Sequence, residues 1–440
     1  MTFRKTEKYR GAVEIVRTLK KAGHEALMVG GCVRDLLRKR APKDFDVATS
    51  ARPEQVAKLF RRTIPVGVQF GVQMVLKGDT PYEVATFRTD QEYKDGRHPE
   101  GVIFTGPKED ALRRDFTVNG LFYDPMKKRV IDYVGGKEDL KRKLIRAIGE
   151  PARRFAEDRL RMLRAVRFAA NLDFQIDPDT FKAVQKSSEG IVQVSPERIR
   201  DELVKLFTGP HPGRGLLLLD ECGLLQVILP EVARMKGVAQ PPEFHPEGDV
   251  FIHTRMVLDG LKNSSAIVAM GALLHDVGKP PTFRIADRIR FDGHDRVGRK
   301  MAEQICRRLR FSNAETEAIC ELVGDHMRFK DVRQMRLSTL KRFMAKPTFQ
   351  EELMLHRADC MASHKDLSNW RFMRRQLRRL PKEEIKPKPL VNGHDLLRLG
   401  YAEGPAIGVI LKAVEERQLE RELSSKSEAL AWITEAFPRR

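Results

Sequence analysis

Two aspartates separated by one residue, Asp44 and Asp46, form the first pattern in the sequence that could do chemistry. Alternate residues of a β-strand point to the same side, so a strand here would project both carboxylates together. Two such carboxylates can hold the pair of Mg²⁺ ions that in-line phosphoryl transfer uses. Glu83, in a second predicted strand, could supply a third carboxylate. Alone, an Asp-x-Asp triplet is more often a polar strand edge, and Glu83 fits an exposed strand position equally well.

A glycine pair, Gly30 and Gly31, stands between a predicted strand over residues 25–29 and a helix predicted from Val33. Glycines at a strand-to-helix turn let a phosphate approach the backbone N–H groups at the helix N-terminus. Arg34 lies a turn inside that helix, where its guanidinium can reach a triphosphate oxygen. By itself, a glycine pair usually marks only a turn.

The block over residues 113–120 carries a further set of groups that suit a nucleotide. Arg114 can pair with triphosphate oxygens, whereas Asp115 and Asn119 offer hydrogen-bond partners for a ribose. The alternative interpretation is a surface turn followed by the start of a helix.

Asp158, Arg161, Arg164 and Arg167 recur every three residues in a segment predicted to be helical. Residues three apart are neighbours on one face of a helix, so this spacing predicts that Asp158 and Arg161 lie side by side. Without further context, the pattern indicates a surface ion pair on a basic helix face.

A second group of residues combines histidines with carboxylates in a region predicted to be helical. Mixed imidazole and carboxylate donors favour Mn, Fe, Co, Ni or Zn over calcium. Isolated histidines are mostly surface or core residues, but an adjacent His-Asp pair followed by Val-Gly-Lys is more specific. The group comprises His253, His275, Asp276, His294, His326 and Asp359.

Strand-type alternation recurs at residues 73–76, 82–87, 121–123 and 130–133 and fades after about Gly149. Helical patterns follow, separated by Gly- and Pro-rich breaks at 209–213 and 240–242. The sequence therefore predicts an α+β first third and an all-α remainder.

The composition indicates a polyanionic partner, because 81 Lys and Arg against 61 Asp and Glu leave a net charge of +20. No apolar run approaches the roughly 20 residues of a membrane span, and residues 1–21 lack a signal-peptide pattern. Five cysteines without a C-x-x-C pair argue against disulfides and thiolate zinc, which suits a cytoplasmic protein. The basic stretch 371–388 fits an RNA-facing surface and a solvated helix with linker equally well.

Six blocks appear in a fixed order: GGCVRD, DFDVATSA, GVQFGV, TFR, DGRHP and RRDFTVNG. This order closely resembles the head of bacterial class II tRNA nucleotidyltransferases, a branch of the polymerase β superfamily. The resemblance implies that Asp44 and Asp46 bind Mg²⁺ and activate the primer 3′-hydroxyl. It also implies that Gly31, Arg34, Arg114 and Asp115 hold the triphosphate and that Asn119 faces the ribose. Gly120 departs from the family, which more often has Ala there.

The segment around Asp158 resembles the neck motif EDxxR of the same family, which reads incoming bases in place of a template strand. Asp158 would accept a proton from the amino group of cytosine or adenine, and Arg161 would donate to the neighbouring acceptor. The resemblance implies that Arg164 and Arg167 hold the base or the triphosphate. The block SPERIRDEL at 195–203 resembles a supporting helix, with Ser195 as its N-cap.

The polar segment 88–99, which contains Asp95 and Arg97, matches a family loop that is needed for addition of the final A. Its presence argues against an enzyme that adds only CC.

Residues 245–280 resemble an HD phosphohydrolase domain. The resemblance implies a core ligand set of His253, His275, Asp276 and Asp359 for a divalent transition metal. His294 and His326 match the additional ligands of two-metal members. Since the full set is present, phosphohydrolase activity is favoured over a structural relic.

The predicted organisation is a nucleotidyltransferase head (1–149), a neck with a templating helix (150–210), an HD-type helical body (211–370) and a basic helical tail (371–440). The predicted function is addition of C, C and A from CTP and ATP to the 3′ end of tRNA. An A-adding enzyme, a poly(A) polymerase and an RNA-binding phosphohydrolase with an inactive head remain alternatives. The Arg-rich block that such poly(A) polymerases usually carry near residues 65–71 is not seen. No feature indicates a membrane or an obligate protein partner.

Overall fold

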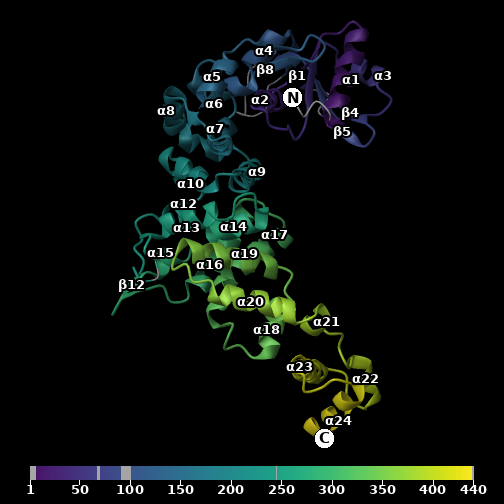
Figure 1. Ribbon diagram of the computed structural model, residues 1–440, viewed down its shortest axis with the longest axis vertical. Coiled ribbons are helices and arrows are strands. Elements are labelled where there is room, and N and C mark those ends of the chain that lie inside the picture. The colour runs from purple at the N-terminus through teal and green to yellow at the C-terminus, as the bar shows by residue number, and fades with distance from the viewer. Residues whose placement is uncertain (1–5, 67–69, 91–100, 244, 439–440) are drawn as a thin grey trace. The chain divides into compact units, whose positions relative to one another are not determined.

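The computed structural model describes residues 6–66, 70–90, 101–243 and 245–438. The chain divides into two compact units (Figure 1). The first is Met1–Ala233 with Arg308–Arg310, and the second is Arg234–Arg307 with Phe311–Arg440. No helix in the described ranges is long and apolar enough to cross a membrane.

The first unit begins with a seven-stranded sheet in the order β3-β4-β5-β2-β1-β8-β9. Its neighbouring strands are antiparallel except for β2 and β5, which run parallel. Each strand predicted from the sequence is present, and β3 is an additional one. The strands are β1 (Ala26–Val29), β2 (Asp46–Thr49), β3 (Thr63–Pro65), β4 (Val72–Lys77), β5 (Thr80–Thr86), β8 (Leu121–Asp124) and β9 (Arg129–Asp132).

Strand β1 is buried on both faces, which explains why its sequence is apolar at every position. Met28 packs with helix α1 (Glu7–Lys21) on one side, through Ile15 and Leu19. On the other side, Leu27 and Val29 join a second cluster around Phe87 and Phe122. The sheet is therefore covered on both faces at β1.

Helix α2 (Gly31–Leu37) begins directly after β1, two residues before the predicted start at Val33. The remaining elements of the head surround the sheet. They are α3 (Pro53–Leu59), the paired strands β6 (Arg88–Asp90) and β7 (Val102–Phe104), α4 (Pro107–Leu112), the 3-10 turn η3 (Thr117–Asn119) and α5 (Gly136–Arg142).

The helix predicted to carry both Asp158 and Arg161 is interrupted. Helix α6 (Pro151–Glu157) ends before Asp158, which has an extended backbone, and α7 (Leu160–Leu172) starts two residues later. The Asp158 carboxylate accepts a hydrogen bond from the Leu160 N–H at 3.1 Å. Aspartate competes in this way with helical hydrogen bonding and favours helix starts, so the prediction of one shared helix face was wrong.

The rest of the first unit is helical apart from a two-residue parallel pairing of β10 (Leu144–Ile145) with β11 (Gln175–Ile176). Ser195 occupies the N-cap position of α9 with Pro196 at the first helical position, as predicted, although its side chain makes no capping hydrogen bond to a described residue. The helical elements are α8 (Pro178–Ser187), η4 (Ser188–Gln193), α9 (Pro196–Phe207), α10 (Pro212–Glu221), α11 (Leu224–Ile228) and α12 (Pro230–Ala233).

The second unit is helical, with one short hairpin of β12 (Arg284–Ile285) and β13 (Ile289–Arg290). Helix α14 (Ala266–Leu274) is buried from Val268 onward, which suits a central helix of the HD-type body. The other helical elements of this body are α13 (Val250–Asp259), α15 (Lys279–Thr282), α16 (His294–Arg308), α17 (Asn313–Asp325), η5 (His326–Asp331), α18 (Leu337–Met344) and α19 (Phe349–Ala362).

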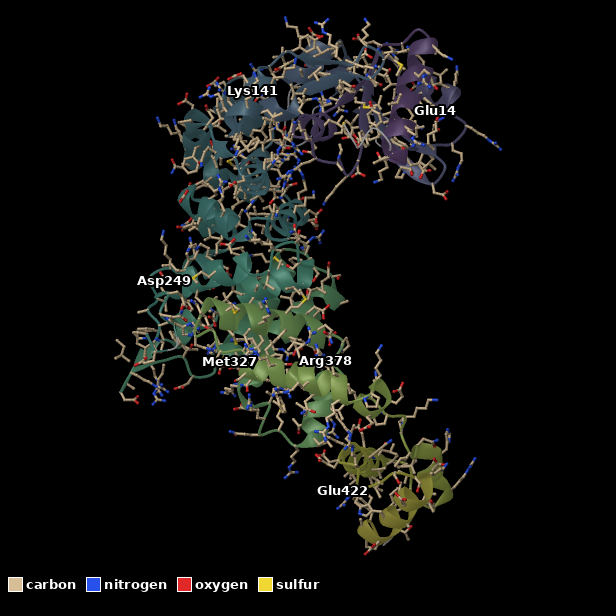
Figure 2. All side chains as sticks on the ribbon, viewed as in Figure 1. Glu14, Lys141, Asp249, Met327, Arg378 and Glu422 are labelled. Carbon is tan, nitrogen blue, oxygen red and sulfur yellow. The ribbon has the colours of Figure 1, made fainter. Side chains whose placement is uncertain are left out.

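The C-terminal part of the second unit has a small core of its own, around Leu396, Val414 and Ile433. Before it runs α20 (Ser368–Arg379), an amphipathic helix that buries Met373 and carries basic side chains such as Arg378 (Figure 2). The last elements are α21 (Lys382–Ile385), α22 (Gly393–Arg398), α23 (Pro405–Leu419) and α24 (Lys426–Ala436).

Candidate active site and candidate metal centre

The carboxylates of the head lie at one end of the parallel pair β2 and β5. Val47 is in register with Val84, so Asp46 and Glu83, each one residue earlier, lie on the same side. Burial and the negative charge of Glu83 raise the pKa of Asp46 to about 6, against the opposing effect of Arg114. Burial is the larger cause of this shift, and a cation bound beside Asp46 and Glu83 would counter both burial and repulsion.

Asp44 lies outside β2, contrary to the prediction that both aspartates project from one strand. The ladder with β1 ends at the pair Val29–Asp46, because β1 turns away at Gly30. The Asp44 side chain is 78% exposed and lies 3.1 Å from the ammonium group of Lys8. Asp44 is therefore not fixed by strand pairing.

Gly30 forms the turn from β1 into α2 with φ of 76° and ψ of −135°, a conformation that is essentially restricted to glycine. A Cβ atom at this position would also lie 3.4 Å from Nη1 of Arg114. Arg114 itself makes a two-pronged pair with the buried carboxylate of Asp110. The predicted glycine turn is present, and it brings Arg114 beside the start of α2.

Four of the predicted nucleotide-binding residues form one hydrogen-bonded chain. Arg34 Nη1 donates to Asn119 Oδ1 at 2.7 Å, and Asn119 Nδ2 donates to Asp115 Oδ1 at 3.1 Å. The other Asp115 oxygen accepts two bonds from Arg164, at 2.9 and 2.5 Å. Burial would raise the pKa of Asp115, but the charge and hydrogen bonds of Arg164 lower it to about 2. This series of hydrogen bonds thus joins the start of helix α2, next to the glycine turn, to helix α7.

Phe168, for which no role was predicted, packs against three arginines of this network. The guanidinium carbons of Arg34, Arg164 and Arg167 lie 5.4, 5.2 and 4.0 Å from the centre of its ring. Such contacts of cations with an aromatic face are favourable, more so when the groups are shielded from water. Arg167 also donates to Glu202 on α9 at 2.5 Å.

Asp158 and Arg161 are engaged with different partners. Arg198 on α9 donates to both Asp158 oxygens, at 2.9 and 3.2 Å. Arg161 donates to Glu157 at 2.8 Å and to the Arg113 carbonyl at 3.2 Å. Arg198 and Glu202 belong to the block at 195–203, which was predicted only as a supporting helix. Its resemblance to the family was the one signal in the sequence that could have pointed to these two residues.

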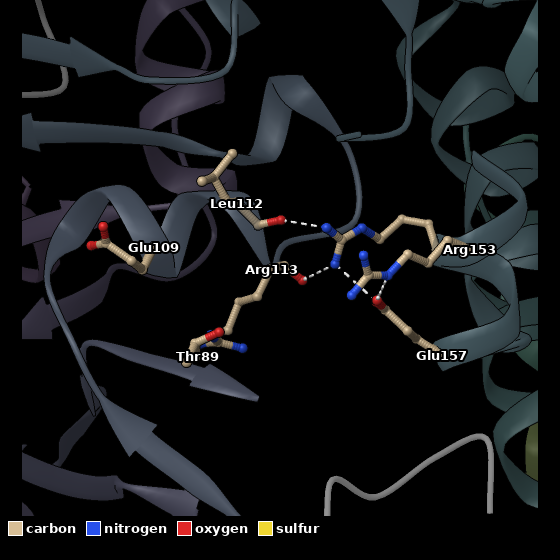
Figure 3. A pocket seen from close by; sticks show the side chains of 7 residues that line it. Thr89, Glu109, Leu112, Arg113, Arg153 and Glu157 are labelled. Atoms are coloured by element: carbon tan, nitrogen blue, oxygen red, sulfur yellow. Dashed lines mark hydrogen bonds and ion pairs between the residues drawn. The ribbon is translucent and has the colours of Figure 1, made fainter. Parts of the chain in front are cut away.

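A hollow of about 200 Å³ lies where α6 meets α4 and β6. In Figure 3, dashed lines join a guanidinium group of α6 to the backbone oxygens of Leu112 and Arg113, whereas the Arg113 side chain runs toward Thr89. Arg154 donates to the Leu112 carbonyl at 2.6 Å and to Glu157 at 2.9 Å. Since Arg161 reaches the same end of α4, two guanidinium groups satisfy carbonyls at the C-terminus of that helix. The predicted loop residues Asp95 and Arg97 lie outside the described residues.

The histidines and carboxylates of the second unit converge, as predicted. Two groups of three, which share no residue, each have ligand atoms within 4.8 Å of one another: His253 with His275 and Asp359, and Asp276 with His294 and His326. Oδ2 of Asp276 also lies 3.2 Å from Nε2 of His275, so Asp276 faces both groups. Within the described ranges, such groups of three occur only in this unit.

The buried imidazoles fit a metal site because hydrogen bonds at Nδ1 fix the orientation of their rings. His275, His294 and His326 each place Nδ1 within 2.7–2.8 Å of a backbone carbonyl oxygen three residues earlier. This arrangement puts the proton on Nδ1 and leaves Nε2 as the donor atom. Nε2 of His253 and of His275 is buried and makes no hydrogen bond with any described residue, although Asp359 Oδ1 lies 3.1 Å from the former.

The electrostatics also suit a cation. Burial and the nearby His294 lower the pKa of His326 to about 4, so its imidazole is neutral at pH 7. The pKa of Asp276 lies well below its usual value despite burial, because His275 and Lys279 stabilise the carboxylate. Neutral imidazoles and ionised carboxylates are the forms that ligate divalent metals.

Three family models match successive parts of the chain. Residues 26–146 match the family "Poly A polymerase head domain". Residues 173–236 match "Probable RNA and SrmB- binding site of polymerase A", and residues 249–363 match "HD domain".

One curated relative, the CCA-adding enzyme of Anoxybacillus flavithermus, is 42% identical over 231 residues, which are 52% of this chain and 58% of the relative. The chain thus spans somewhat more than half the length of this curated relative. The structure of the Bacillus stearothermophilus CCA-adding enzyme in complex with CTP is similar with a TM-score of 0.76 and 27% identity, covering 98% of each chain. That of the Thermotoga maritima enzyme complexed with tRNA has a TM-score of 0.59 at 18% identity, over 98% of this chain and 96% of that one, and supports the fold alone.

Fold, site and similarity together define a polymerase-type nucleotidyltransferase head followed by helical domains, one of them an HD domain. The chain is therefore similar to class II tRNA nucleotidyltransferases and poly(A) polymerases, as the motifs predicted.

Proposed function

We propose that this protein adds C, C and A to the 3′ end of tRNA, using CTP and ATP. The observation that carries the proposal is the hydrogen-bonded chain Arg34–Asn119–Asp115–Arg164, which joins a glycine turn beside the carboxylates to the neck. The similarity to CCA-adding enzymes supports the choice of substrate class.

In this proposal the head binds the nucleotide and aligns it for attack. Gly30 and Gly31 leave room for a phosphate, while Arg34 and Arg114 pair with triphosphate oxygens and Asn119 faces the ribose. The tRNA 3′-hydroxyl oxygen bonds to the α-phosphorus, the bond between that phosphorus and the bridging oxygen breaks, and pyrophosphate leaves. The hydroxyl proton passes to a carboxylate or to water.

Asp44 and Asp46, with Glu83 as a third carboxylate, would hold the metal ions of the head. Two Mg²⁺ ions bound there would neutralise charge on the attacking and leaving oxygens. The raised pKa of Asp46 and the exposed position of Asp44 fit a site that draws together when cations bind.

The base would be selected by Asp158 and Arg161 from the neck. In the described arrangement both side chains are paired, with Arg198 and Glu157 respectively. An incoming base would take the place of these partners. Cytosine and adenine both offer an amino proton to the aspartate beside an acceptor for the arginine, whereas uracil and guanine offer a carbonyl there.

A single assay separates the proposed function from its alternatives. One tRNA ends at the discriminator base and a second ends in CC, and each is incubated with CTP, ATP and Mg²⁺. The proposal predicts three added nucleotides on the first tRNA and one on the second. Extension of only the CC-ended tRNA would make this an A-adding enzyme, and a long A tract would make it a poly(A) polymerase. No extension would leave the RNA-binding phosphohydrolase.

We infer a second activity, metal-dependent phosphoester hydrolysis in the HD domain. It is favoured by the convergence of four buried imidazoles and two carboxylates, among which Nε2 of His253 and of His275 has no hydrogen-bond partner in the described residues. A bound divalent metal would supply an activated water and a Lewis acid. The test is hydrolysis of 4-nitrophenyl phosphate and of bis(4-nitrophenyl) phosphate by full-length protein loaded with Mn²⁺, Co²⁺ or Ni²⁺. Absence of hydrolysis with every metal and both substrates would argue for a structural role.

A further inference from the structure

One imidazole of the HD cluster is held differently from the other three. His275, His294 and His326 rest their Nδ1 atoms on backbone carbonyl oxygens of the preceding turn. His253 instead places Nδ1 2.6 Å from a carboxylate oxygen, Oε1 of Glu247. A carbonyl fixes only the tautomer, whereas a carboxylate also increases the electron density on the metal-binding nitrogen.

Glu247 is held in place for this contact. Its side chain is only 4% exposed, and the same oxygen lies 2.9 Å from Nδ1 of His245. The second oxygen, Oε2, is buried and has no hydrogen-bond partner among the described residues. A buried carboxylate of this kind costs free energy unless its charge is used, so its position requires an explanation.

We propose that Glu247 is a positioning residue that makes His253 the strongest imidazole donor of the cluster. The site formed by His253, His275, Asp276 and Asp359 would therefore bind a divalent metal more tightly than the site of Asp276, His294 and His326. Glu247 thus sets the order in which the two sites fill. This inference rests on the metal centre proposed above.

The alternative role for Glu247 is that of a metal ligand. His245, Glu247 and His253 have donor atoms within 4.8 Å of one another and could in principle hold an ion themselves. The two N–O distances of 2.6 and 2.9 Å are, however, those of hydrogen bonds. His253 would also have to present both ring nitrogens to metals at once. The positioning role is therefore favoured, and a third bound ion is an outcome of the test.

The test is calorimetric titration of metal-free full-length protein with Co²⁺, supported by the visible absorption of bound Co²⁺. Both Asp44 and Asp46 are replaced by Asn throughout, so that the head carboxylates do not contribute. The parent protein should bind two ions with distinct affinities. Glu247→Gln, which keeps a hydrogen-bond acceptor and removes the charge, should weaken the tighter site about 10–100-fold and leave the weaker one unchanged.

Two controls separate this role from a loss of structure. Glu352→Gln changes another buried glutamate of the same body, which accepts a hydrogen bond from Thr348, and both affinities should stay as in the parent. His245→Ala leaves the Glu247–His253 contact in place and should preserve the order of filling.

Equal weakening of both sites by Glu247→Gln, or no weakening, would overturn the inference while the metal centre stands. A third ion lost with Glu247 would also overturn it, by making this residue a ligand. A parent protein that binds no Co²⁺ would instead refute the metal centre itself, and the positioning role with it.

Discussion

The two candidate sites of this protein are built in opposite ways. In the head, Asp44 is exposed and paired with Lys8, and the base-reading candidates Asp158 and Arg161 are paired with Arg198 and Glu157. In the HD-type body, four imidazoles are buried, and hydrogen bonds at their Nδ1 atoms orient the rings.

This difference fits the functions proposed for the two sites. A site that accepts several nucleotides in turn needs side chains that can exchange a protein partner for a ligand. A metal centre gains affinity when its donors are fixed in advance, because little ordering remains for the moment of binding. We therefore expect ligand binding to rearrange the head site and to leave the geometry of the HD cluster almost unchanged.

The largest expected effect is at Asp46. Replacing Asp46 with Ala should lower nucleotide addition about a thousandfold or more, since metal ions supply several kcal/mol of transition-state stabilisation. Incorporation of labelled CTP into tRNA under single-turnover conditions measures the rate. Co²⁺ binding by the HD cluster should be unaffected. Near-normal addition by Asp46→Ala would show that this carboxylate does not hold the metal ions of nucleotide addition.

The converse experiment replaces His275 and Asp276 with Ala. This variant should lose metal-dependent hydrolysis of 4-nitrophenyl esters and the tight binding of Co²⁺, because both groups of donors lose a member. Nucleotide addition should continue at a rate close to that of the unchanged protein. Loss of both activities in a variant with normal circular dichroism would mean that the two sites are not independent.

A smaller effect is expected for base selection. Changing Asp158 or Arg161 to Ala should reduce discrimination against UTP and GTP about 10–100-fold, which corresponds to the 1–3 kcal/mol of a good side-chain–base pair. The measurement is kcat/KM for each of the four nucleotides. Arg198→Ala is the matched variant, since it releases Asp158 without removing it, and it should keep the preference for CTP and ATP. Unchanged rejection of UTP by Asp158→Ala would show that this residue does not read the base.

The smallest effect concerns stability and pH at Glu352, a buried carboxylate outside both sites. Burial raises its pKa from 4.5 to about 7, so the folded protein favours the protonated form. The contribution of this group to the free energy of unfolding is fully present below pH 4.5. It is lost as the pH rises through 7, so that at pH 8 the free energy of unfolding is lower by up to about 3 kcal/mol.

Replacing Glu352 with Gln should remove that dependence. Tm should rise relative to the unchanged protein at pH 8 and differ little from it at pH 5. Thermal unfolding at the two pH values gives the comparison. An equal change in Tm at both pH values would mean that ionisation of Glu352 does not cause the pH dependence of stability.

Several features of this protein were determined by its sequence alone. The strands of the head follow from alternating or fully apolar segments, and the turn at Gly30 follows from a conformation that only glycine adopts easily. The HD cluster was predicted as a set because residues 245–280 resemble an HD domain and because mixed imidazole and carboxylate donors suit a transition metal. Such features depend on residue type and short-range spacing.

Other features were decided only by tertiary structure. Asp158 was predicted to share a helix face with Arg161, but its carboxylate begins a new helix and pairs with Arg198, 40 residues away. The bond between Arg34 and Asn119 spans 85 residues. Periodicity reports on neighbours within about two helical turns, whereas these partners meet only because packed elements bring distant segments together. For the same reason, the sequence did not distinguish Glu247 from an ordinary loop carboxylate, and only its burial against His253 did.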